Sequence, residues 1–130
     1  MTEIQPEKTY TFLLVEDQKT IRMFLNYFLT NAYKGCKVIE AEEGKQALAA
    51  LRETSVDLII TDMEMPGRDG ETLLKQLKGN AVLAKKPTLI YTGSPSKGAD
   101  FEKEYYATTR LVAKGDQVKL KESLEALLNP

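Results

Sequence analysis

The sequence predicts an α/β fold, a doubly wound parallel sheet with helices on both faces. Short apolar segments of the kind that form strands alternate five times with segments whose apolar residues recur at helical spacing. Several strand-like segments are continuously apolar, which is typical of strands buried on both faces. Strands that alternate with helices in this way form parallel sheets through right-handed crossovers. A length of 130 residues, of which 42% are hydrophobic, suits one domain and is too short for two.

Three strands and two helices are expected in the first half of the chain. The strands are residues 10–15, 37–41 and 56–61, and the helices are residues 18–30 and 44–53. The first helix begins near Gln18, where the apolar residues change to helical spacing. The third strand runs directly into Asp62, and Pro66 cannot continue it. The chain is therefore expected to leave the sheet just after this carboxylate.

The second half is expected to contribute three helices and two strands. They are helix 71–78, strand 87–91, helix 100–108, strand 110–113 and a final helix that Asp116 caps. In helix 100–108, Phe101 and Tyr105 are expected to face inward, with Tyr106 partly so. The inward face of the final helix is expected to be Val118, Leu120, Leu124, Leu127 and Leu128. Residues 1–9 are expected to form a polar tail and residues 10–128 the domain.

Composition excludes several classes of function. The chain has no histidine, which excludes histidine acid–base catalysis, a Ser-His-Asp triad and histidine metal ligands. A net charge of −1 without a basic excess argues against direct nucleic-acid binding. The single cysteine, Cys36, cannot form an internal disulfide and is expected to be a packed thiol. No apolar run reaches the ~20 residues of a membrane span, and no signal peptide is recognisable, so a soluble cytoplasmic domain is expected.

Polar side chains gather at the carboxyl ends of the predicted strands. These ends carry Glu16 and Asp17, then Asp62, then Thr92, and finally Lys114. Taken singly, each has an ordinary explanation as a helix cap, a turn residue or a surface lysine, and Asp69 beside Gly70 is interpreted as a turn residue. In a parallel sheet, however, all strand ends lie at one edge, where ligands of open α/β sheets bind. We therefore expect these groups to form one site.

Such a site suits phosphoryl chemistry. Three neighbouring carboxylates repel one another unless a cation lies among them, and Mg²⁺ prefers a few carboxylates together with water and phosphate oxygens. An aspartate can act as a nucleophile and form an aspartyl phosphate. The lysine would neutralise the phosphoryl oxygens, and the threonine hydroxyl would donate a hydrogen bond to them. Asp62 is therefore a candidate phosphoryl acceptor.

The sequence also resembles the receiver domains of two-component response regulators, in particular the single-domain chemotaxis type. The matching segments are FLLVEDQ, EAEEGKQAL, DLIITDMEMPGRDG and LIYTGS, with Lys114 at the end of the last strand, and they cover residues 10–128. The resemblance implies the flavodoxin-like (CheY-like) fold, with five parallel strands in the order 2-1-3-4-5 and five helices. It further implies that a phosphohistidine of a sensor histidine kinase or histidine phosphotransfer protein is the phosphoryl donor, and that an unknown downstream protein is the target.

The resemblance also implies a role for each residue of the site. Asp62 would be the phosphoacceptor, Thr92 the switch hydroxyl and Lys114 the phosphate-binding lysine, while Asp17, Asp62 and the backbone carbonyl of Glu64 would bind Mg²⁺, with Glu16 acting through water. Such a protein would catalyse its own phosphorylation and dephosphorylation rather than turn over a substrate. Glu64 and Ser94 are expected to tune hydrolysis of the phosphoryl group. Membrane and nucleic-acid contacts are not expected, and the oligomeric state stays open.

Two positions depart from the family pattern. The family usually has a proline, often in a cis peptide, directly after the lysine, but Gly115 follows here. A non-proline cis bond costs about 2.5 to 4 kcal/mol, so a trans bond or a loop reshaped around glycine is expected. The family also has an aromatic residue three positions before the lysine, where this chain has Leu111. The step that follows phosphorylation is therefore expected to differ from the usual one.

Three alternatives remain open. The chain could be a receiver-like interaction module that does not transfer phosphate. It could be a Mg²⁺-dependent phosphohydrolase with an aspartyl nucleophile, although such enzymes place the nucleophile after the first strand with a second aspartate two positions on, and here position 64 is Glu. A flavin carrier of the same strand order is disfavoured, because no phosphate-binding loop rich in Ser, Thr and Gly follows the first strand.

Overall fold

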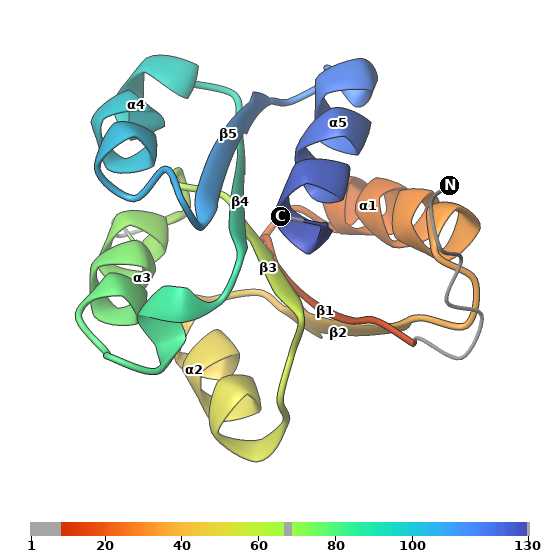
Figure 1. Cartoon of the computed structure of the whole chain (residues 1–130), viewed down its shortest axis with the longest axis horizontal. Coiled ribbons are helices and arrows are strands. Elements are labelled where there is room, and N and C mark those ends of the chain that lie inside the picture. The colour runs from red at the N-terminus through yellow and green to blue at the C-terminus, as the bar shows by residue number, and fades with distance from the viewer. Residues whose placement is uncertain (1–8, 67–68, 130) are drawn as a thin grey trace.

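A computed structural model of the chain describes residues 9–66 and 69–129 and contains a single five-stranded parallel sheet (Figure 1). The strands are β1 (Thr11–Val15), β2 (Lys37–Ala41), β3 (Leu58–Thr61), β4 (Thr88–Thr92) and β5 (Thr109–Ala113). Their order in the sheet is β2-β1-β3-β4-β5, which confirms the expected order. The chain therefore winds outward in both directions from β1, and the carboxyl ends of all strands lie at one edge.

Helices cover both faces of this sheet (Figure 1). They are α1 (Lys19–Ala32), α2 (Gly44–Glu53), α3 (Asp69–Lys78), α4 (Pro95–Glu104) and α5 (Gln117–Leu128), with a short 3₁₀ turn, η2 (Leu83–Lys85), after α3. One face packs against α1 and α5, and the other packs against α2, α3 and α4. The doubly wound arrangement with five helices is therefore confirmed.

The strands divide their side chains between these two layers. Phe12 and Leu14 of β1 belong to the large apolar cluster under α1 and α5, whereas Leu13 and Val15 belong to the cluster under α2 and α3. Successive strand residues point to opposite faces, so a central strand of a covered sheet must be apolar at every position. The continuous apolar runs that predicted the fold arise in this way. Cys36 also packs against the first cluster, as expected.

The boundaries of α4 were predicted wrongly. The sequence predicts a helix over residues 100–108, but α4 spans Pro95–Glu104 and the chain turns over the next four residues. Pro95 occupies the start of the helix, where its fixed φ angle is favourable and its missing N–H is not needed. Only Gly98 of this helix is buried, so there is no apolar stripe to reveal the helix.

Two expected inward-facing residues lie at the surface. Tyr106, which follows the end of α4, is 56% exposed, and Val118 in the first turn of α5 is 71% exposed. The buried face of α5 consists instead of Leu120, Ser123, Leu124 and Leu127. The prediction for Val118 was wrong because a residue two positions before Leu120 lies on a different side of the helix.

Two further findings bear on the sequence-based expectations. Among residues 9–66 and 69–129, no helix has the length and apolar character needed to cross a bilayer. The expected N-terminal tail lies outside the described residues except for its last residue.

Candidate functional site

Four neighbouring strands bring the expected residues to the carboxyl edge of the sheet. Glu16 and Asp17 follow β1, Asp62 follows β3, Thr92 ends β4, and Lys114 follows β5. The strand register aligns these ends, because Val15 pairs with Thr61 and Thr92 pairs with Ala113. The sheet therefore places the acid pair and Asp62 side by side, with the hydroxyl and the lysine on the following two strands.

Lys114 holds two buried carboxylates together. Its Nζ lies 2.7 Å from Oδ2 of Asp62 and 3.1 Å from Oε1 of Glu16. Both acidic side chains are only 2% exposed, whereas that of Lys114 is 20% exposed. The backbone N–H of Lys114 donates to the carbonyl of Thr92 at 2.8 Å, which continues the β4–β5 pairing and fixes where the lysine side chain begins. The ammonium group thus offsets the repulsion of two neighbouring acids.

Burial and charge act in opposite directions on these groups. Burial raises the pKa of Glu16 to about 7, although the Gln18 N–H and Lys114 both stabilise its charged form. Burial alone would lower the pKa of Lys114, but hydrogen bonds to Asp62 and Glu16 outweigh it and raise this pKa. The lysine therefore stays charged, and it is shared between two acids that compete for it.

Asp17 has the features of a metal ligand. Its Oδ1 is buried and has no hydrogen-bond partner among the residues that the structure describes. An unpartnered buried carboxylate oxygen is costly unless a cation or water occupies the adjacent space. Within the described part of the chain, no three acidic side chains are placed as they would be around an ion, and Glu16 and Asp62 are both paired with Lys114. The oxygen donors at this edge nevertheless fit a hard divalent cation.

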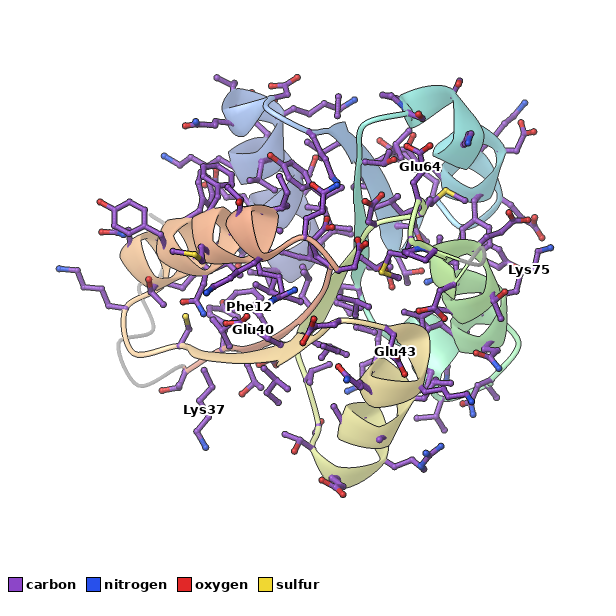
Figure 2. All side chains as sticks on the ribbon, turned by 180° about the vertical axis from the view of Figure 1, so that it is seen from behind. Phe12, Lys37, Glu40, Glu43, Glu64 and Lys75 are labelled. Atoms are coloured by element: carbon purple, nitrogen blue, oxygen red, sulfur yellow. The ribbon has the colours of Figure 1, made fainter. Side chains whose placement is uncertain are left out.

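The loop after Asp62 connects the acid to Thr92 and α4. The N–H of Glu64 donates to Oδ1 of Asp62 at 3.0 Å, and Oε1 of Glu64 lies 3.5 Å from the Thr92 hydroxyl. The Glu64 carboxylate forms an ion pair with Lys97 of α4 at 3.1 Å, and Figure 2 shows it beside that helix. Hydrogen bonds from Ser94 and Lys97 lower the pKa of Glu64. Glu64 therefore touches both the hydroxyl and the helix.

The loop after Lys114 is shaped around glycine. Gly115 has a φ of +95°, a backbone conformation that favours glycine, and its N–H donates to the Tyr91 hydroxyl at 2.9 Å. The described residues contain no cis peptide bond, as expected for this position. Leu111 is 7% exposed and packs with Met63 beneath α4.

The interpretation of Asp69 as a turn residue is wrong. Asp69 is the first residue of α3, and its Oδ2 accepts a hydrogen bond from the N–H of Gly44, the first residue of α2. The carboxylate satisfies a backbone donor that the start of a helix leaves free. Sequence reasoning also missed Tyr91 and Arg22, whose polar contacts at the site join elements that are distant in sequence.

Comparisons with known proteins agree with this architecture. A family model described as the response regulator receiver domain matches residues 12–124. Histidine kinase P4 of Formosa agariphila is 32% identical over 99 residues, which make up 76% of this chain and 7% of that protein. The matched regions cover only 6 to 13% of the length of four curated relatives. The similarity therefore concerns one domain of those larger proteins.

Solved structures show the same likeness. The response regulator TrrA from Thermotoga maritima, in complex with Mg²⁺-BeF, has a TM-score of 0.78 at 26% identity, covering 92% of this chain and 100% of that chain. The signal receiver domain of a signal transduction histidine kinase from Syntrophus aciditrophicus has a TM-score of 0.74 at 29% identity, covering 92% of this chain and 90% of that chain.

Proposed function

Because the chain belongs to the family of response regulator receiver domains, we propose that it accepts a phosphoryl group on Asp62 from a phosphohistidine of a sensor histidine kinase or histidine phosphotransfer protein. The observation that carries the proposal is the environment of Asp62, a buried carboxylate 2.7 Å from the Lys114 ammonium group at the carboxyl edge of the sheet. The phosphoryl group would then signal, by a conformational change, to a downstream protein. The reaction would take place in the cytoplasm.

The transfer step needs little covalent chemistry from the protein. An Asp62 oxygen forms a bond to phosphorus while the P–N bond of the phosphohistidine breaks, and the imidazole leaves with the electron pair and gains a proton. Lys114 can follow the negative charge from the carboxylate to the phosphoryl oxygens, because it already lies at hydrogen-bond distance. The Thr92 hydroxyl can exchange its long contact with Glu64 for a phosphoryl oxygen.

Mg²⁺ fits the remaining donors of the site. Asp17, Asp62 and the backbone carbonyl of Glu64 would hold the ion, with Glu16 acting through water, and the unpartnered Oδ1 of Asp17 supports this assignment. When bound, the ion would neutralise charge on the phosphoryl oxygens. Acidic side chains that now share Lys114 would be freed to interact with the ion, and the lysine would be freed to interact with the phosphoryl group.

The proposal is tested with a small-molecule donor, which requires no knowledge of the partner kinase. The protein is incubated with acetyl phosphate or phosphoramidate and Mg²⁺, and its intact mass is measured. We expect one phosphoryl adduct that requires Mg²⁺ and is lost in Asp62→Asn. Asp57→Asn is the matched control, because Asp57 lies before β3 at the opposite edge of the sheet.

The other outcomes point to different functions. No adduct, together with no Mg²⁺ binding, would contradict the proposal and indicate a receiver-like interaction module. An adduct that survives Asp62→Asn would place the acceptor elsewhere. Repeated turnover of a phosphate monoester would instead indicate a phosphohydrolase.

A further inference from the structure

Arg22 of α1 contacts the main chain directly before Asp17. Its Nη1 donates to the carbonyl oxygen of Glu16 at 2.8 Å. Its Nε donates to Oε1 of Glu40 on β2 at 3.1 Å, and Asn26 donates to the other oxygen of Glu40 at 3.0 Å. Figure 2 shows Glu40 in the region between α1 and β2. One guanidinium group therefore ties α1, β2 and the acidic turn after β1 to one another.

The environment of Arg22 is unlike that of a surface ion pair. The Arg22 side chain is only 12% exposed, whereas Glu40 is 42% exposed. The planar guanidinium can donate in two directions at once, which a lysine ammonium on a flexible stem does less well. The contact with the Glu16 carbonyl is partly buried, so the arginine can fix the position of this backbone oxygen.

The position of the Glu16 carbonyl determines where the backbone of Asp17 lies. The peptide unit that joins Glu16 to Asp17 is planar, so fixing its oxygen also fixes the nitrogen and Cα of Asp17. The preceding peptide is held as well, because the N–H of Glu16 donates to the carbonyl of Ala41 at 3.0 Å. The side chain itself adds little restraint at one oxygen, because the buried Oδ1 of Asp17 has no hydrogen-bond partner among the described residues. The backbone is therefore a main determinant of where this carboxylate lies.

We infer that Arg22 is a positioning residue that holds the Asp17 carboxylate in place for Mg²⁺ through the carbonyl of Glu16. This inference rests on the proposed function, because it assigns Arg22 a part in the same metal-dependent reaction. Arg22 does not touch the ion or the reacting atoms. Its effect passes through one peptide unit.

Positioning and simple electrostatics predict opposite results for Arg22. A guanidinium group close to a cation site repels the cation, so its removal should tighten Mg²⁺ binding if charge alone matters. If Arg22 positions Asp17, removal should weaken binding despite the loss of a positive charge. Loss of an outer partner of a metal ligand typically lowers affinity by 10- to 100-fold, and we expect about tenfold for Arg22→Gln.

The test measures Mg²⁺ affinity of the whole chain by isothermal titration calorimetry, with urea unfolding in the absence of Mg²⁺ alongside. Arg22→Gln should bind Mg²⁺ more weakly. Arg22→Lys keeps the charge but loses the two-directional fork, so it should also bind more weakly, by a smaller factor. This second variant decides the matter if Arg22→Gln does not fold.

Glu40→Gln is the matched control. It removes one of two exposed acidic partners of Arg22, the other being Glu42 at 3.9 Å. The contact with Glu16 stays in place, so Mg²⁺ affinity should stay within about twofold of the wild type. Unchanged or tighter binding by Arg22→Lys would overturn the inference, even if the variant were less stable. Failure of the wild-type chain itself to bind Mg²⁺ would overturn the proposed function together with this inference.

Discussion

Lys114 forms ion pairs with two buried acids whose negative charges would otherwise repel each other. Glu16 and Asp62 share one ammonium group, at 3.1 and 2.7 Å. Removing one partner from such a buried arrangement usually costs more than the arrangement contributes, because the remaining charges lose their compensation. The lysine is therefore a structural counter-ion in this structure, and on the proposed function it would bind the phosphoryl group after transfer.

A buried lysine, Lys78, is expected to make the stability of the protein depend on pH. Its side chain lies at the end of α3, and its Nζ is 3.2 Å from the Thr108 hydroxyl and 3.4 Å from both the Ala84 carbonyl and the Thr88 hydroxyl. Burial lowers the pKa of Lys78 from 10.5 to about 8. None of these partners is a carboxylate, so its charge has no direct counter-ion in these contacts.

We predict that wild-type stability rises between about pH 8 and pH 10.5 relative to Lys78→Met. In this window the unfolded chain binds more protons than the folded chain, so an increase in pH favours folding. At pH 7 the variant should be more stable by about 1 to 3 kcal/mol, because it no longer buries a charge. Urea unfolding at pH 7 and at pH 10 measures the difference. A difference that is the same at both pH values would contradict the prediction.

The groups at the sheet edge were predictable from sequence, but their partners were not. Strand ends of a parallel sheet coincide in space, so Asp62 and Lys114 could be placed together from the order of the elements. The role of Tyr91 could not be predicted in this way, because in the sequence it looks like an ordinary strand residue. Only the fold brings its hydroxyl oxygen 2.9 Å from the backbone nitrogen of Gly115. The burial of Lys78 could not be predicted either, because lysine is rarely buried and gives no apolar pattern in the sequence.

At the scale of elements, two glycines let helices approach the candidate site closely. A methyl group on Gly98 of α4 would lie 2.8 Å from Cδ1 of Leu111 and 2.9 Å from Sδ of Met63. A methyl group on Gly70 of α3 would overlap the Asp62 carbonyl and lie 2.8 Å from the main chain of Met63. The first overlap involves flexible ends of side chains, whereas the second involves the backbone next to the candidate acceptor.

We predict that Gly70→Ala is much more damaging than Gly98→Ala. The Gly98 change gains about 1 kcal/mol of helix propensity and costs about 1 to 3 kcal/mol in overpacking, so the net effect should be small. Gly70→Ala must displace the main chain that carries Asp62, so it should lower both stability and the rate of phosphorylation. Urea unfolding and acetyl phosphate kinetics measure the two effects. Equal effects of both changes would show that the overlap at Gly70 is easily relieved.

The element most difficult to predict, α4, is also the helix with the fewest buried residues. Strands and the helices α1, α2, α3 and α5 follow from apolar periodicity, because packing of an apolar face stabilises them. In α4 only Gly98 is buried, and a glycine contributes nothing to an apolar stripe. The misplaced boundaries therefore have a physical origin, because α4 packs through a glycine and not through an apolar stripe.

At the scale of the whole molecule, the core consists of three clusters of unequal size. The cluster under α1 and α5 and that under α2 and α3 are large, whereas the third contains four buried residues, Met63, Leu74, Ile90 and Leu111, with Phe101 against it. The smallest cluster supports α4 and includes the residue next to Asp62. The residue that follows the candidate acceptor therefore packs in the smallest of the three clusters.

We predict that α4 opens locally without unfolding of the rest of the chain. Native-state amide hydrogen exchange should show that the amides of α4 exchange through an opening of several kcal/mol less than those of β1 and α1, which should need nearly global unfolding. The comparison is internal, so no variant is required. Equal protection of α4 and α1 would indicate that the small cluster holds as firmly as the large ones.

The small cluster under α4 has a consequence for how a signal could leave this protein. A helix that moves easily needs only a modest coupling free energy, about 1 to 3 kcal/mol, to change its preferred position when a nearby group changes. Thermodynamic linkage then works in both directions. On the proposed function, a target protein that binds the displaced helix more tightly when Asp62 is phosphorylated must favour the phosphorylated form by the same factor at equilibrium. The target would therefore raise the population of the state that recruits it.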